Sequence, residues 1–131
     1  MKQSTKPSEK RPWADTFRAA IEGILYGLRT QRNFKVHSAV AVIVVAIGLI
    51  TGIDTSDWLW ISLCIMLVFA TELMNTAVEA TVNLVTTEWH PMAKAAKDTA
   101  AGAVLIVVIF SVVVGIMIFA KPMMTIIKQL L

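Results

Sequence analysis

Three long stretches with almost no formal charge constrain this chain more than any other feature of its sequence. Residues 37–53, "HSAVAVIVVAIGLITGI", and 99–120 contain no Asp, Glu, Lys or Arg, and residues 58–85 contain only two carboxylates. A run of about 17–25 apolar residues is long enough to cross a bilayer as a helix. At 56% hydrophobic and 16% charged residues, a chain of 131 residues cannot bury its apolar surface in a soluble fold. We therefore predict one all-α integral membrane domain, residues 1–131, with three transmembrane helices.

The residues before the first span predict a different kind of helix. In 12–35 the apolar side chains recur at helical spacing, charged side chains occupy the other side, and Pro12 suits a helix start. The apolar set is Trp13, Phe17, Ile21, Ile24, Leu25 and Leu28. This pattern predicts an amphipathic helix lying along the membrane surface. The polar residues 1–11 are expected to be a disordered tail.

The distribution of basic residues predicts the orientation of the spans. Eight of the twelve Lys and Arg precede residue 36, and the connection 86–98 contains two more. The connection between the first two spans contains none. We expect the third span to end at Lys121 and Pro122, and the tail from Lys121 onward contains two. The positive-inside rule therefore places the N-terminus and the connection 86–98 in the cytoplasm and the C-terminus outside. The basic charge suits an anionic membrane surface, and no nucleic-acid partner is expected.

The second span, 58–85, is unusual because it contains acids. Glu72, Asn75 and Glu79 lie within about 60° of one another around a helix, and Asn83 extends the same stripe. Counted from Asp57 at about 1.5 Å per residue, Glu72 lies about 22 Å and Glu79 about 33 Å along the helix. A hydrocarbon core of about 30 Å then places Glu79 at the cytoplasmic boundary and Glu72 roughly 8 Å inside it.

Three interpretations of this stripe stay open on the residues alone. Polar side chains join helices to one another in membranes, and intramembrane acids also serve proton or cation pathways. A cation-coupled transporter needs a path that reaches both surfaces, whereas this stripe reaches one. An enzyme that joins a lipidic and a dissolved reactant needs an acid just inside the membrane and another at its surface. The stripe favours the enzyme over a transporter or another non-enzymatic membrane protein.

A second polar cluster, "HPMAKAAKD", follows at the same cytoplasmic edge. Lys94 and Lys97 are one helical turn apart, and Asp98 with Thr99 is expected to open the third transmembrane helix. Lysines beside the positive end of a helix suit a phosphate group, although lysines are also ordinary at a cytoplasmic boundary. The chain has no GxxxxGK[ST] and no GxGxxG motif, so a nucleotide site must be built in another way.

The segments "RNFKVH", "ELMNTAVEATVNLVT" and "EWHPMAKAAKDTAAGAVL" closely resemble the small bacterial lipid kinases, the diacylglycerol kinase and undecaprenol kinase family. The resemblance covers about residues 13–120. It implies a homotrimer in the bacterial cytoplasmic membrane, with active sites shared between neighbouring subunits at the cytoplasmic face. It also implies ATP with Mg²⁺ as the phosphoryl donor and a membrane lipid alcohol as the acceptor.

The resemblance also implies roles for individual residues. Glu72 matches the general base that receives the acceptor's proton, Glu79 matches a metal-binding glutamate, and Asn75 matches the polar residue between them. Lys97 and Asp98 match the pair on the phosphate side, with Lys94 beside them. These roles fit phosphoryl transfer, which needs charge neutralisation and a carboxylate that orients the attacking hydroxyl.

The chain departs from the family's pattern at two positions. Gln31 stands where a second metal-binding glutamate is usual, and Asn83 stands where Asp is frequent. An amide oxygen ligates Mg²⁺ without adding charge, which predicts a weaker metal site or one completed by another group. Both departures bear on the level of activity.

The same kind of resemblance predicts the identity of the lipid acceptor. "RNFKVH", "HPMAKAAKDTAAGAVL" and "GIMIF" are more similar to the undecaprenol kinase branch, with diacylglycerol as the alternative acceptor. One of Arg29, Arg32 and Lys35 is expected to contact ATP. His37 is interpreted as a polar residue at the start of a span rather than a catalytic one, and His90 as a loop residue.

Overall fold

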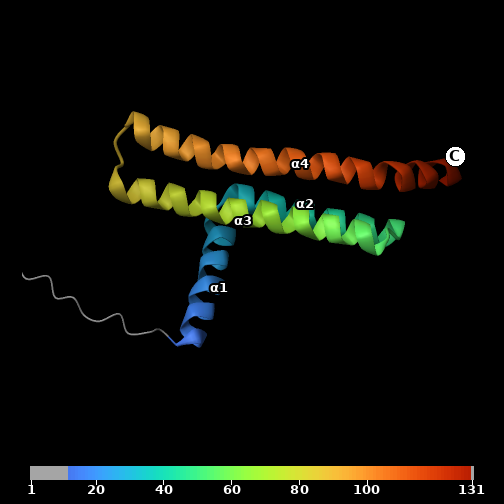
Figure 1. The fold of residues 1–131 in the computed structure, drawn as a ribbon, viewed down its shortest axis with the longest axis horizontal. Helices are drawn as coiled ribbons and strands as arrows, with labels where there is room; N and C mark the ends of the chain where they lie inside the picture. Colours follow the sequence, from blue (N-terminus) through green and yellow to red (C-terminus); the bar gives the residue numbers. More distant parts are fainter. Residues whose placement is uncertain (1–11, 131) are drawn as a thin grey trace, which may run out of the picture.

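A computed structural model describes residues 12–130, which form four helices joined by short connections (Figure 1). The helices are α1 (Trp13–Thr30), α2 (Arg32–Thr51), α3 (Thr55–Val85) and α4 (Pro91–Leu130). α2, α3 and α4 are each long and apolar enough to cross a membrane. The predicted class, an all-helical integral membrane protein with three spans, is confirmed. The expected disordered tail, 1–11, lies outside the described residues.

The three apolar helices run alongside one another, and α1 lies crosswise to them (Figure 1). α3 and α4 make the most extensive contact, and α2 packs mainly on α3. The crosswise direction of α1 is the one expected of an amphipathic helix in the plane of the membrane. At about 1.5 Å per residue, the 31 residues of α3 extend about 46 Å, which exceeds the roughly 30 Å hydrocarbon core. One end of α3 therefore extends into the interface or the solvent.

Gln31 forms the elbow between α1 and α2. Its backbone is extended, with φ −96° and ψ 120°, and its N–H donates to the Gly27 carbonyl at 2.9 Å. The predicted surface helix over 12–35 is therefore wrong at its end, because α1 stops at Thr30 and α2 already begins at Arg32. A single extended residue is enough to turn the chain from the crosswise α1 into the direction of α2.

Close packing around Phe34 holds the elbow against α3. Phe34 is 2% exposed, and its ring stacks on Phe69 with 5.1 Å between centroids. Gly27 is buried beside them, and a Cβ at that position would lie 3.1 Å from Cδ2 of Leu73. The small residue in α1 thus lets the surface helix lie directly on the base of the bundle.

The turn between α2 and α3 depends on two glycines and an aspartate. Gly52 adopts the left-handed conformation that ends α2, with φ 63°. Oδ1 of Asp54 accepts a hydrogen bond from the Asp57 N–H at 2.9 Å and caps α3. Gly48 leaves room for the indole of Trp58, since a Cβ there would lie 2.8 Å from the ring. This turn fixes α2 beside the start of α3.

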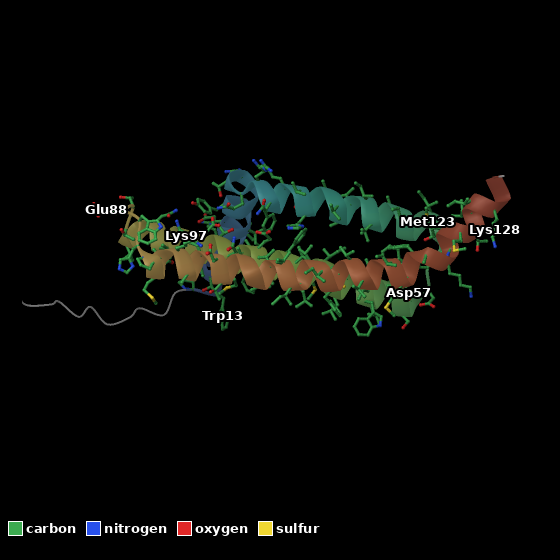
Figure 2. The ribbon with its side chains drawn as sticks, turned by 90° about the horizontal axis from the view of Figure 1, so that it is seen from above. Trp13, Asp57, Glu88, Lys97, Met123 and Lys128 are labelled. Atoms are coloured by element: carbon green, nitrogen blue, oxygen red, sulfur yellow. The ribbon has the colours of Figure 1, made fainter. Side chains whose placement is uncertain are left out.

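α4 continues well beyond the expected end of the third span. Lys121 and Pro122 were expected to end the helix, but α4 includes both and extends to Leu130. Proline removes one backbone hydrogen bond and bends a helix, which neighbouring structure can tolerate. Figure 2 shows the last turns, around Met123 and Lys128, diverging from the line of the preceding helix.

Candidate active site

The predicted polar stripe of α3 faces inward along one side of the helix. Glu72 is 2% exposed and Asn75 is 7% exposed, while Glu79 is half-buried. The Asn75 amide nitrogen donates to Oε1 of Glu79 at 3.3 Å. Its Oδ1 is buried and has no hydrogen-bond donor among residues 12–130. The stripe thus presents a buried carboxylate, a free amide oxygen and a second carboxylate in succession.

Glu72 has a partner on α2 that the spacing of residues along the sequence does not predict. Nε2 of His37 lies 3.1 Å from Oε1 of Glu72, and the imidazole is 21% exposed. A buried carboxylate is costly unless a polar group lies beside it, so this contact offsets part of the cost of burial. His37 was interpreted as a residue at the start of a span, and its place beside Glu72 assigns it to the site. Its helical spacing carried no signal, because the contact joins two helices.

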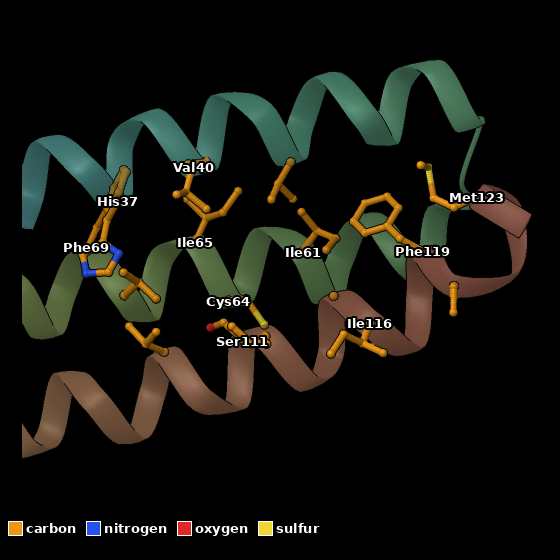
Figure 3. A pocket seen from close by; sticks show the side chains of 17 residues that line it. His37, Val40, Ile61, Cys64, Ile65, Phe69, Ser111, Ile116, Phe119 and Met123 are labelled. Atoms are coloured by element: carbon orange, nitrogen blue, oxygen red, sulfur yellow. The ribbon is translucent and has the colours of Figure 1, made fainter. Parts of the chain in front are cut away.

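Two cavities lie beside His37, and Glu72 lines one of them. One, of about 330 Å³, lies between α2, α3 and α4 and is lined by Asn33, His37, Glu72 and Asn75 together with apolar side chains of α4. The other is an almost wholly apolar cleft of about 510 Å³ that runs between the same helices toward Phe119 and Met123 (Figure 3). His37 lines both. A lipidic and a polar environment are therefore adjacent at one imidazole.

The predicted phosphate-side residues lie at the end of the bundle near the α3–α4 connection. Nζ of Lys97 donates to Oδ1 of Asn83 at 2.7 Å, which joins α4 to the stripe on α3. Lys94 contacts the carboxylate of Asp98 one turn along α4. A cavity of about 370 Å³ lies among these residues and the connection. Figure 2 shows Lys97 beside the Glu88 connection and far from Asp57.

The helix that carries these lysines begins earlier than expected. Asp98 and Thr99 do not open it, because α4 starts at Pro91, a residue suited to the first helical position. Nδ1 of His90 accepts a hydrogen bond from the Met92 N–H at 3.2 Å, so His90 is a capping residue rather than only a loop residue. α4 therefore begins six residues before Lys97, and any phosphate binding by the lysines rests on their side chains.

Two side-chain groups of the stripe are of the kind that bind magnesium. Among residues 12–130 no three His, Cys, Asp or Glu side chains come together as a metal site. Gln31 is half-buried at the elbow and makes no capping hydrogen bond. Magnesium is commonly bound by one or two carboxylates while substrate phosphates and water supply the other ligands. Glu79 and the unpaired Oδ1 of Asn75 fit that kind of site, in which the nucleotide brings most of the ligands.

Comparison with known proteins assigns the chain to a family. The family model described as prokaryotic diacylglycerol kinase matches residues 18–119. This range contains α2, α3 and most of α1 and α4, together with all the stripe residues and the lysines of the α3–α4 region.

Individual relatives have two different names. An undecaprenol kinase of Bacillus subtilis (strain 168) is 44% identical over 104 residues, 79% of this chain and 85% of the relative. A diacylglycerol kinase of Synechocystis sp. is 36% identical over 127 residues, 92% of this chain and 73% of the relative. The diacylglycerol kinase of Escherichia coli (strain K12) is 30% identical over 80 residues, 61% of this chain and 66% of the relative. With a family model matched over most of its length, this chain belongs to the prokaryotic diacylglycerol kinase family.

Proposed function

We propose that this protein transfers the γ-phosphoryl group of ATP to the hydroxyl of undecaprenol at the cytoplasmic surface of a bacterial membrane. That it is a lipid kinase, a phosphotransferase with an alcohol acceptor, follows from its family. The choice of undecaprenol is supported by the 44% identity to a relative named for that substrate. Diacylglycerol is the second candidate, since the other named relatives are diacylglycerol kinases.

The observation that carries the proposal is the position of Glu72. Its carboxylate is buried between membrane-spanning helices, and its partner His37 lines both the apolar cleft and the polar cavity. A lipid alcohol arriving from the bilayer reaches this point without leaving an apolar environment. A dissolved nucleotide reaches it along the stripe from the end of α3 that carries Glu79 and Asn83. The two reactants therefore have separate routes to one carboxylate.

The chemical step requires a base for the acceptor and cations for the donor. As the acceptor oxygen attacks the γ-phosphorus and the bond to the bridging oxygen of ADP breaks, Glu72 takes the hydroxyl proton. Lys97 exchanges its contact with Asn83 for the phosphates, where it stabilises charge that develops in the transition state. Bound Mg²⁺ would neutralise phosphate charge, held by Glu79 and Oδ1 of Asn75.

The proposal includes a trimer with its N-terminus in the cytoplasm. Much of the surface of α2, α3 and α4 is apolar and exposed in one chain, so lipid or other copies must cover it. The concentration of basic residues before residue 36 supports the cytoplasmic N-terminus. A neighbouring subunit could supply further ligands to the Mg²⁺ that Glu79 and Asn75 would hold within one chain.

Transfer of label from [γ-³²P]ATP tests the function directly. Purified protein in mixed micelles receives undecaprenol or diacylglycerol in parallel, and the extracted lipid product is identified by its mass. We expect labelled undecaprenyl phosphate as the preferred product. Preferential labelling of diacylglycerol would establish the second candidate, and label in neither lipid would contradict the proposed function.

A further inference from the structure

We propose that His37 is a positioning residue for Glu72, which it holds through the contact of its Nε2 with the carboxylate. The inference rests on the proposed function, since it concerns the carboxylate that receives the acceptor's proton. In the structure Nε2 lies 3.1 Å from Oε1 of Glu72. That contact engages one carboxylate oxygen and leaves Oε2 for the cavity that Glu72 lines. His37 thereby sets which oxygen faces the acceptor hydroxyl.

The surroundings of Glu72 explain why a positioning group is needed. A glutamate side chain has three rotatable bonds, and its carboxylate must keep one orientation to meet a hydroxyl in line with phosphorus. Asn75, one turn along α3, donates instead to Glu79. Thr76, also one turn along, donates its hydroxyl to the backbone carbonyl of Glu72. Among the described contacts, the His37 imidazole is the side chain that orients this carboxylate.

The chemical type of the partner also matters. Residues 36–93 contain no Lys or Arg. After the first turn of α2, neither α2 nor α3 therefore offers Glu72 a permanent cation. A permanent cation in contact would compete with the hydroxyl proton for the carboxylate. An imidazole in contact can instead orient the carboxylate and offset part of its burial without placing a permanent charge beside it. The partner lines both the lipid-facing cleft and the polar cavity, so it stands where the acceptor must arrive.

Three substitutions at one position separate this role from simple packing. In His37→Gln the amide nitrogen can occupy the place of Nε2, whereas in His37→Asn it is limited to the place of Nδ1 and cannot reach Glu72. We expect His37→Ala and His37→Asn to lower kcat about 10- to 100-fold, because a misdirected carboxylate costs rate. The KM for ATP should change less than about twofold, since His37 lies on the lipid side of the stripe. His37→Gln should keep most of the wild-type kcat.

The readouts are lipid phosphorylation with varied ATP, size in detergent solution and thermal unfolding of each variant. The control is Ser38→Ala, the next residue of α2, whose hydroxyl donates to the Phe34 carbonyl at 2.8 Å. It should keep wild-type kcat. Equal activity of the Gln and Asn variants, or wild-type kcat in His37→Ala, would overturn the positioning role. A loss of kcat that follows loss of thermal stability across the variants would also overturn it. Wild-type protein that phosphorylates no lipid would instead refute the proposed function.

Discussion

Lys97 and Asn83 join the first turns of α4 to the last turns of α3 through a 2.7 Å hydrogen bond from Nζ to Oδ1. Asn83 lies eleven residues after Glu72, about 16 Å along α3. The lysine therefore rests on the exposed side of the stripe, on the route that we propose for the nucleotide. A neutral amide holds it without neutralising its charge, which leaves Lys97 available to the phosphates.

Replacing Lys97 should damage the nucleotide side of the reaction. Lys97→Met is expected to lower kcat/KM for ATP about 100-fold, because it removes a cation that stabilises charge developing on the phosphates. Steady-state lipid phosphorylation with varied ATP measures the effect. Lys94→Met serves as the comparison, since Lys94 is already engaged with Asp98 and both side chains are well exposed. A larger loss in Lys94→Met than in Lys97→Met would reverse the two assignments.

Replacing the proposed base should stop phosphoryl transfer without disrupting the fold or the oligomer. Glu72→Gln keeps the size of a side chain that is 2% exposed and keeps an oxygen beside Nε2 of His37, but it cannot take a proton. We expect phosphorylation of lipid to fall about 10²- to 10⁴-fold, with an unchanged elution volume in detergent. Glu22→Gln, an exposed carboxylate of α1, is the matched control and should remain active. Full activity of Glu72→Gln would show that another group is the base.

Most of the architecture could be predicted from the sequence, because charge-free runs and amphipathic spacing report directly on the bilayer. The position at which α2 starts could not be predicted in this way. Residues 12–35 have helical periodicity throughout, and neither Pro nor Gly stands at Gln31 to indicate the elbow. The bend arises from packing of Phe34 against Phe69, a contact between helices that no local pattern encodes.

The site could be predicted only in part, because local spacing reports on one helix and not on contacts between helices. Glu72, Asn75 and Glu79 share one helix, so their spacing predicted a common face, which the structure has. The His37 partner of Glu72 lies on another helix, and periodicity gives no information about such contacts. The start and end of α4 differed because the prediction followed the uncharged window, 99–120. The helix continues through the charged turn before that window and past Pro122 after it.

The amide at Gln31 predicts a modest affinity for the metal. Gln31→Glu would add a negative charge where the resemblance to the family places a metal ligand, and we expect the Mg²⁺ concentration for half-maximal rate to fall about tenfold. Titration of Mg²⁺ at saturating ATP and lipid measures this. Gln31→Ala, which removes the amide oxygen, should require at least as much Mg²⁺ as the wild type. An unchanged Mg²⁺ profile in Gln31→Glu would place residue 31 outside the metal shell.

The close approach of Gly48 to Trp58 should make this glycine the most sensitive of the chain's transmembrane glycines. In Gly48→Ala the new Cβ would lie 2.8 Å from Cη2 of the indole, so the ring or a helix must shift, at a cost of about 1–3 kcal/mol in free energy of unfolding. Gly115→Ala is the matched control, because its Cβ would meet nothing within 4 Å and alanine favours the helix. Equilibrium unfolding in mixed micelles measures both. Since the close atoms belong to the outer ring of the indole, Trp58→Phe should offset much of the loss in Gly48→Ala. Equal stability of Gly48→Ala and Gly115→Ala would show that the two helices do not depend on this contact.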